Sequence, residues 1–125
     1  MHIIFVCQFG GAKSVIAANL FNREAAKRGR DWTASAASAE EPYDAVPVPV
    51  VDLLRADGID VSAFRPRRLE RTDLEEASRV ISIDCSTDVP DVERWDDVPK
   101  VSDGVEQSAA AIRRHVDALI EQLDA

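Results

Sequence analysis

Hydrophobic residues follow two kinds of pattern along the chain, and the two alternate. Continuous apolar runs at residues 2–6 and 79–84 predict strands that are buried on both faces. A weaker alternation at residues 32–36 predicts another strand, and residues 91–95 predict a short edge strand. The chain therefore has four candidate strands.

Helical patterns separate these strands. Helices are predicted at residues 14–28 and 50–57, each followed by a glycine that favours a helix end. Thr72 with Glu75 three residues later forms a capping-box pattern, which predicts the start of another helix. The clearest helical spacing lies near the carboxyl end, at Ile112, Val116, Leu119, Ile120 and Leu123.

The alternation of strands and helices predicts a single α/β domain over residues 1–125. We expect a three-layer sandwich, in which a mainly parallel four-stranded sheet lies between helices on both faces. The segment at residues 40–49 contains three prolines and is predicted to be a loop without a helix. Ligands in parallel sheets bind beyond the carboxyl ends of the strands, and Cys7 lies at such an end.

Composition and charge exclude some functions. The 125 residues are 46% hydrophobic, as in a globular protein with a core, and the formal net charge is −8. This charge argues against nucleic acid or an anionic membrane as a partner. No apolar run reaches the ~18 residues that span a bilayer, and the start lacks the pattern of a secretory leader. Two cysteines do not make a disulfide framework, so we expect reduced thiols in the cytoplasm.

The segment CQFGGAKS, residues 7–14, joins the first strand to the first helix and combines four features of an anion site. Gly10 and Gly11 let the backbone curl, so that several N–H groups point toward one spot. The helix N-terminus and Lys13 add positive charge there. The same surroundings favour the nucleophilic thiolate of Cys7, and Ser14 could donate a hydrogen bond to it. The alternative is a packed cysteine beside glycines that only make a turn.

This segment resembles the phosphate-binding loop of the low-molecular-weight protein tyrosine phosphatases and of the arsenate reductases that share their fold. That family carries Cys, five residues, Arg, then Ser or Thr between its first strand and first helix. Here the corresponding positions are Cys7, Lys13 and Ser14. The resemblance continues in order through most of the chain, in SAAS, LLRADGIDV, RPRRL and VISID.

The resemblance implies roles for individual residues. Cys7 would attack phosphorus and form a phosphocysteine, with Lys13 and Ser14 assisting. Asp97, or its neighbour Asp96, would be the general acid, and Tyr43 would line the pocket. The alternatives are a solvated loop acid at Asp97 and a surface tyrosine at position 43. The substrate's oxygens would be held by the loop residues Gln8, Phe9, Gly10, Gly11 and Ala12.

The chain departs from the family pattern at several places. Lys13 replaces an arginine and loses its bidentate geometry. Gly10 replaces the family's loop asparagine, and Ala12 replaces a second cysteine found in many of the phosphatases. The family's late Asp-Pro has only an approximate counterpart in WDDVP, which includes Asp96 and Asp97.

Cys85 follows the predicted strand at 79–84 and is expected at the same sheet edge as Cys7. Arsenate reductases of the thioredoxin-coupled type have a cysteine near this place that attacks the first one. They also have a third cysteine soon after, which is lacking here. Cys85 is therefore a candidate redox partner of Cys7, and the alternative is a packed cysteine at a strand end.

The favoured hypothesis is a phosphatase of the low-molecular-weight tyrosine type that needs no metal or other cofactor. Its partner would be phosphate or an arsenate-like oxyanion, including one carried by a phosphotyrosine protein. The first alternative is an arsenate reductase that uses Cys7 and Cys85. The second is a catalytically degenerate member that binds phosphate without turnover, because Lys13 and the blurred acid motif depart from the family.

Overall fold

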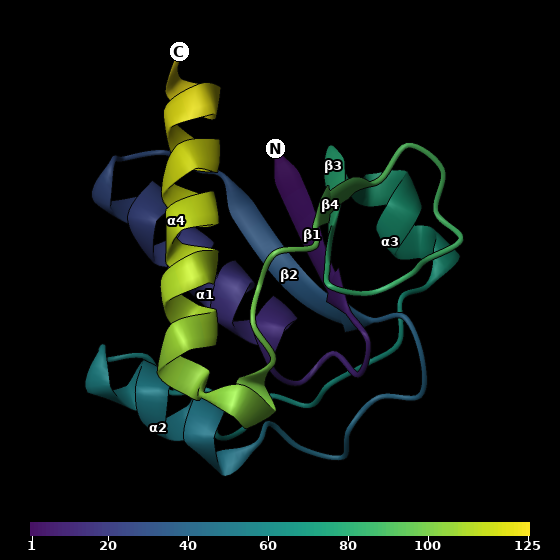
Figure 1. The fold of residues 1–125 in the computed structure, drawn as a ribbon. Coiled ribbons are helices and arrows are strands. Elements are labelled where there is room, and N and C mark those ends of the chain that lie inside the picture. The colour runs from purple at the N-terminus through teal and green to yellow at the C-terminus, as the bar shows by residue number, and fades with distance from the viewer.

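Four parallel strands form the central sheet in the order β2-β1-β3-β4 (Figure 1). Their bounds are β1 (His2–Cys7), β2 (Thr33–Ser38), β3 (Arg79–Ile83) and β4 (Glu93–Trp95). The structure is a computed structural model that describes residues 1–125. β1 lies in the middle of the sheet and is buried from Ile3 onward, as its continuous apolar run predicts.

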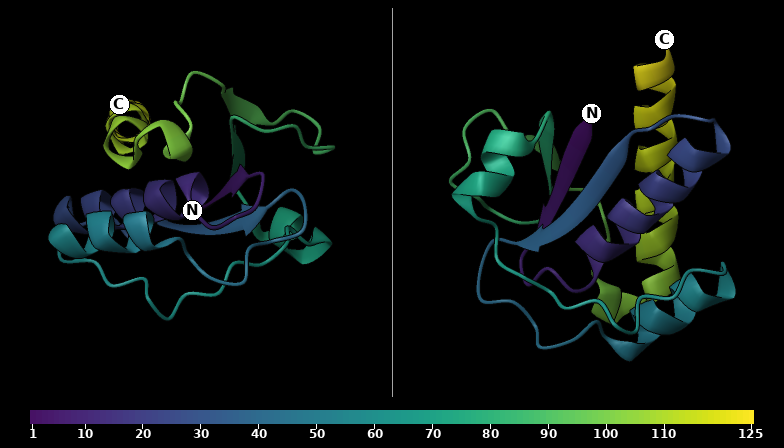
Figure 2. Two further views of the ribbon diagram at one scale, coloured as in Figure 1. Left: turned by 60° about the horizontal axis from the view of Figure 1, so that its bottom comes forward. Right: turned by 180° about the vertical axis from the view of Figure 1, so that it is seen from behind.

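Four helices pack around this sheet, which confirms the predicted α/β class. They are α1 (Lys13–Lys27), α2 (Val48–Ala56), α3 (Arg71–Glu76) and α4 (Val105–Asp124), and a short 3₁₀ turn, η1 (Val101–Asp103), precedes α4. The views in Figure 2 place α1, α2 and α4 together on one side and α3 on the other. The termini lie at one end of the molecule, away from the carboxyl ends of the strands (Figure 1).

The core is divided between the two faces of the sheet. On the α1 and α4 side, the ring of Phe5 contacts Phe21 of α1 edge-on, with centroids 6.2 Å apart, and Trp95 of β4 at 5.4 Å. The opposite face carries a smaller cluster of Ile4, Val6 and Ala37. Alternate residues of β1 therefore serve different layers, which explains why its run has no polar position.

Two local predictions are wrong. The proline segment at 40–49 is not helix-free, because α2 begins at Val48, with Pro47 as N-cap and Pro49 in the first turn. A proline is tolerated there because the first N–H groups of a helix have no partner within the helix. The capping box of α3 pairs Glu70 with Asp73 rather than Thr72 with Glu75.

The end of β3 differs from the prediction in a way that shapes the site. The strand ends at Ile83 rather than at residue 84, because Asp84 has a left-handed φ of 50°. Aspartate is one of the few residues with a side chain that adopts this conformation readily. The turn directs the chain away from the sheet directly beside the carboxyl end of β1.

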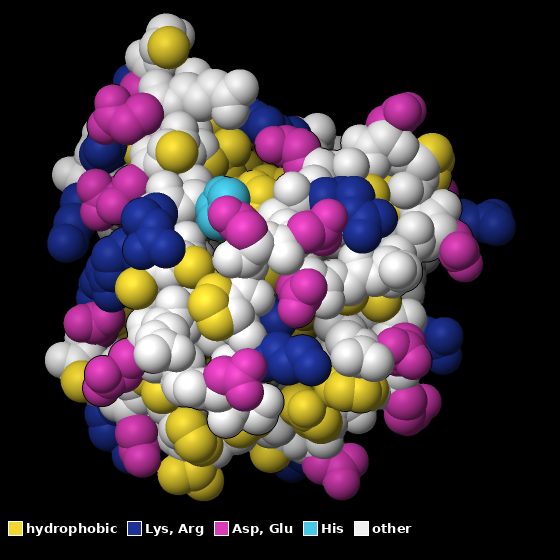
Figure 3. Space-filling model, viewed as in Figure 1, with side chains coloured by type: hydrophobic (Ala, Val, Ile, Leu, Met, Phe, Trp, Pro, Cys, Tyr) yellow, Lys and Arg dark blue, Asp and Glu magenta, His cyan; other side chains and the backbone are white.

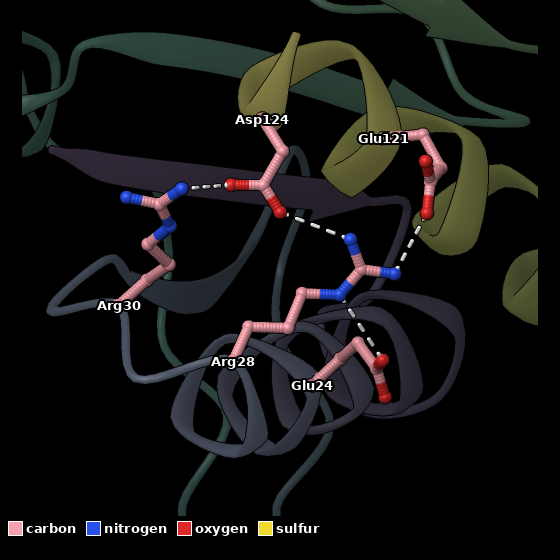
Figure 4. A network of polar contacts seen from close by, with 5 residues as sticks. All are labelled: Glu24, Arg28, Arg30, Glu121 and Asp124. Carbon is pink, nitrogen blue, oxygen red and sulfur yellow. Dashed lines mark hydrogen bonds and ion pairs between the residues drawn. The ribbon is translucent and has the colours of Figure 1, made fainter.

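An ion-pair network joins the end of α1 to the end of α4 (Figure 4). Arg28 contacts Glu121 at 2.8 Å, Asp124 at 2.9 Å and Glu24 at 3.4 Å, and Arg30 contacts the other oxygen of Asp124. These contacts hold the last turn of α4 against the turn that follows α1.

Acidic and basic side chains are interspersed on the face that carries α4 (Figure 3). Hydrophobic atoms appear there in small separate areas. None of the helices combines the length and the apolar character that crossing a bilayer requires.

Candidate active site

The loop between β1 and α1 is fixed from outside by the segment that follows β2. The backbone carbonyls of Cys7, Gln8 and Phe9 accept hydrogen bonds from the N–H groups of Ala39, Glu40 and Tyr43, at 3.0, 3.0 and 3.1 Å. The loop carbonyls are thereby turned away from the space that the loop encloses.

The N–H groups of residues 8–13 donate no hydrogen bond within the protein, and the first helical bond of α1 runs from the N–H of Ile16 to the carbonyl of Ala12 at 3.0 Å. Ala12 is the N-cap and supplies no side-chain cap. Unpaired N–H groups at a helix N-terminus form an electropositive nest that suits a tetrahedral oxyanion.

Cys7 lies at the foot of this nest and is buried. Its Sγ is 3.1 Å from the hydroxyl oxygen of Ser14 and accepts the backbone N–H of Ser14 at 3.4 Å. Ser14 is itself fully buried and lies in the first turn of α1. The N–H of Ser14 and the N-terminus of α1 therefore face the sulfur, which is placed to attack a group bound in the nest.

The two loop glycines are required by close contacts. Gly10 has a left-handed φ of +66°, and a Cβ at this position would lie 2.8 Å from the Cβ of Ser38. A Cβ at Gly11 would lie 2.7 Å from a ring carbon of Tyr43. The loop is thus pressed against the end of β2 and against the tyrosine, and no larger residue fits without movement.

A cavity of about 450 Å³ opens above Cys7. Its lining includes the predicted residues Cys7, Gln8, Phe9, Ala12, Lys13 and Tyr43, together with Pro47, Ile83, Asp84, Lys100, Val101 and Ser102. The rings of Phe9 and Tyr43 contact each other with centroids 4.9 Å apart and form an aromatic wall. The cavity therefore combines an anion site at its base with an apolar side.

Lys13 is paired with a carboxylate that the sequence did not single out. Its Nζ lies 2.9 Å from Oδ2 of Asp84, and only 12% of the lysine side chain is exposed. Asp84 directly follows β3, Cys7 is the last residue of β1, and these two strands are neighbours. That relation was a signal for Asp84, because the carboxyl ends of adjacent parallel strands meet at one edge.

The sequence pattern of one enzyme family, described as low molecular weight phosphotyrosine protein phosphatase, matches residues 2–89. The chain belongs to this family. A search among curated protein sequences found no significant match.

Solved structures with the same fold include family phosphatases and arsenate reductases. A low-molecular-weight protein tyrosine phosphatase from T. tengcongensis superposes with a TM-score of 0.84 at 23% identity, covering 98% of this chain and 99% of that one. An arsenate reductase from Archaeoglobus fulgidus gives 0.79 at 26% identity, covering 95% and 98%. The YwlE arginine phosphatase, a mutant with a phosphorylated active-site serine, gives 0.78 at 19%, covering 99% and 96%. YwlE is from Bacillus subtilis.

The structure does not bring Asp97 or Asp96 to the cavity above Cys7. Asp97 is mostly exposed and lies 2.7 Å from Nε2 of His115, and this hydrogen bond holds the pKa of Asp97 below its usual range. Asp96 pairs with Arg94 at 3.0 Å. The flanking Trp95 and Val98 are buried, which fixes both carboxylates on the outside. Asp97 is therefore not placed to protonate a leaving group over Cys7.

Cys85 lies on the other side of the sheet edge from the cavity. It packs against the cluster of Ile4, Val6 and Ala37. Its thiol donates a hydrogen bond to the carbonyl of Val6, with the sulfur 3.6 Å from the oxygen. Burial, and secondly the nearby Cys7, raises the pKa of Cys85 to about 11. Cys85 is thus held as a protonated thiol at neutral pH. Nowhere in the structure do three or more His, Cys, Asp or Glu side chains gather as metal ligands.

The loop geometry makes Gly10→Ala a severe change in this phosphatase-family chain. We expect the free energy of unfolding to fall by about 2 kcal/mol or more, because left-handed strain adds to the clash with Ser38. Oxyanion binding should fall with it, measured as competitive inhibition by phosphate. Gly29→Ala is the matched control, since Gly29 has φ +70° with nothing within 4 Å. Gly29→Ala should lower the free energy of unfolding by about 1 kcal/mol and leave phosphate binding unchanged. Equal effects of the two variants on stability and on phosphate binding would contradict the packing argument.

Proposed function

We propose that this chain is a phosphatase that hydrolyses aryl phosphomonoesters, phosphotyrosine among them, through a phosphocysteine intermediate. One observation carries the proposal. The Cys7 sulfur lies within hydrogen-bond distance of Ser14, at the foot of a loop whose N–H groups at residues 8–13 have no partner within the protein. Family membership supports the same chemistry.

The first step places the phosphoryl group in the nest. The free N–H groups and the Lys13 ammonium bind the non-bridging oxygens, where charge is spread in the transition state. The Cys7 thiolate attacks phosphorus opposite the leaving oxygen, so that the S–P bond forms as the P–O bond breaks. In the second step water displaces the sulfur, and the hydroxyl and N–H of Ser14 stabilise the departing thiolate.

The aromatic wall supports an aryl substrate. Phe9 and Tyr43 lie beside the anion site and can stack against a ring attached to the phosphate. Tyr43 is 43% exposed, so a bound ring would cover apolar surface that now faces water. Alkyl phosphates lack this contact and should be poorer substrates.

Two assays run side by side on the pure protein test the proposal. Phosphate release from p-nitrophenyl phosphate and from a phosphotyrosine peptide should be readily measured, and thiol-dependent arsenate reduction should stay near background. Arsenate reduction without phosphate release would contradict the proposal. Phosphate binding without either activity would indicate a catalytically degenerate family member that binds phosphate without turnover.

An arsenate reductase is the second candidate, and the position of Cys85 favours it. Cys85 comes two residues after β3, the strand that pairs with β1, and Cys7 is the last residue of β1. In that reaction Cys7 displaces water from arsenate, and Cys85 then attacks the Cys7 sulfur. Arsenite leaves with the As–S electron pair, and the disulfide is reduced by an external thiol.

The state of the two thiols after arsenate treatment separates the candidates. Because Cys85 is only half-buried but protonated and outside the cavity lining, we expect non-reducing peptide mass spectrometry to find it unlinked after arsenate or mild peroxide. A Cys7–Cys85 link formed at the rate of arsenite release would contradict the phosphatase proposal and establish the reductase. A Cys85→Ser variant controls for links to other molecules.

A further inference from the structure

We propose that Asp84 is the general acid of this enzyme and that it serves in place of the family-type acid at Asp97. The inference rests on the proposed phosphatase function and deepens it. It names the group that protonates the leaving oxygen and then activates water.

The carboxylates near the site divide clearly by position. Asp84 lines the cavity above Cys7, whereas Asp96 and Asp97 do not. Asp97 is bound to His115 on α4, and the ring of His115 stacks on Trp95 with centroids 4.6 Å apart. Buried residues on both sides anchor this segment, so Asp97 cannot reach the cavity without unpacking Trp95 or Val98.

The backbone holds Asp84 firmly at the mouth of the cavity. Its N–H donates to the carbonyl of Trp95 at 2.9 Å, and its left-handed φ turns the residue out of the sheet beside the end of β1. The side chain is 37% exposed, so a proton can exchange with solvent. A residue fixed by its main chain with a reachable carboxyl meets the positional requirement for proton transfer.

The pair with Lys13 supplies the means to change protonation. Without substrate, the Lys13 ammonium lies 2.9 Å from the Asp84 carboxylate. A phosphate dianion in the nest draws the ammonium to itself and places like charge beside Asp84. Like charges that share a site favour uptake of a proton by one of them. Substrate binding thus favours the protonated form of Asp84, which can then act as the general acid.

The two chemical steps then balance. As Cys7 attacks and the P–O bond breaks, the proton of the Asp84 carboxyl moves to the leaving oxygen and the alcohol departs neutral. The Asp84 carboxylate next takes a proton from water as that water attacks phosphorus and the S–P bond breaks. The thiolate of Cys7 and a protonated Asp84 are restored.

The assignment is tested by comparing two substrates that differ in their leaving group, with the 125-residue chain described above. In p-nitrophenyl phosphate the leaving group departs without help, whereas in phenyl phosphate it needs a proton. Asp84→Asn should lower turnover of phenyl phosphate by roughly 100-fold, the usual contribution of a general acid, and that of p-nitrophenyl phosphate far less. Asparagine tolerates the left-handed conformation, so the backbone should be kept.

Matched variants make the result specific. Asp91 has a similar left-handed φ of 58° and lies outside the cavity, so Asp91→Asn should leave both rates unchanged. Asp97→Asn should keep the wild-type ratio between the two substrates. A loss in Asp84→Asn that is equal for both substrates would overturn the assignment, since it would mean that Asp84 only positions Lys13. A substrate-selective loss in Asp97→Asn would overturn it as well.

Failure of the proposed function would look different. Wild-type protein that hydrolyses neither substrate would refute the phosphatase proposal itself, and the role of Asp84 with it. Wild-type turnover of both substrates together with an unaltered ratio in Asp84→Asn would refute the role of Asp84 alone.

Discussion

Cys7→Ser is expected to reduce hydrolysis of aryl phosphates by at least about 10⁴-fold, because removal of a nucleophile has effects of this order or larger. The serine hydroxyl would remain protonated in surroundings that stabilise a thiolate well but an alkoxide poorly. Its smaller oxygen can keep the contacts with Ser14 at the foot of the nest. The variant should therefore fold normally.

Binding and chemistry should separate in this variant. The nest is made by backbone N–H groups of residues 8–13, which the substitution does not change. Phosphate should thus still raise the melting temperature of Cys7→Ser, which calorimetry with and without phosphate would measure. A folded Cys7→Ser protein with undiminished turnover would refute the nucleophile. Cys85→Ser serves as the comparison, because the phosphatase proposal gives Cys85 no part in turnover.

Lys13→Ala is expected to lower turnover by about a hundredfold, close to 3 kcal/mol of transition-state stabilisation. Lys13 carries the one full positive charge that lies within the loop itself, and it is mostly covered by its surroundings. Inhibition by phosphate should weaken in parallel. Kinetics on p-nitrophenyl phosphate with phosphate as inhibitor measure both effects.

The comparison with arginine refines this prediction. A guanidinium has five donors and can bind two phosphate oxygens at once, so we expect faster turnover in Lys13→Arg than in the wild type. Lys27→Ala on an exposed turn of the same helix is the control for loss of charge. Turnover and phosphate inhibition that are unchanged in Lys13→Ala would show that Lys13 lies outside the anion site.

The sequence predicted those parts of the fold whose signals are local and repeated. β1 is buried on both faces and reads as an unbroken apolar run, and α4 buries one regular stripe. The start of α2 was missed because prolines were taken as helix breakers, although the first turn accepts them. The cap of α3 was displaced because glutamate and aspartate can form the same reciprocal bonds as threonine and glutamate.

The residues of the site likewise fall into those that the sequence could predict and those that it could not. Cys7, Lys13 and Ser14 are close in sequence, so one loop brings them together whatever the rest of the chain does. Asp84 and Lys100 reach the cavity from distant segments. The position of Asp84 at the end of a predicted strand was a signal for it, whereas no sequence pattern marks Lys100. Asp97 could not be excluded from sequence, because its position depends on how Trp95 and Val98 pack.

Trapping of the covalent intermediate tests the central claim most directly, namely that Cys7 takes the phosphoryl group. The wild-type protein would be mixed with p-nitrophenyl phosphate, quenched in acid at a series of early times, digested and examined by mass spectrometry. The account predicts one phosphoryl group on the peptide that contains Cys7, formed with the first burst of nitrophenol and absent from Cys7→Ser. Nitrophenol release at the full rate with the Cys7 peptide unmodified at every time, or with the phosphoryl group on another residue, would contradict it.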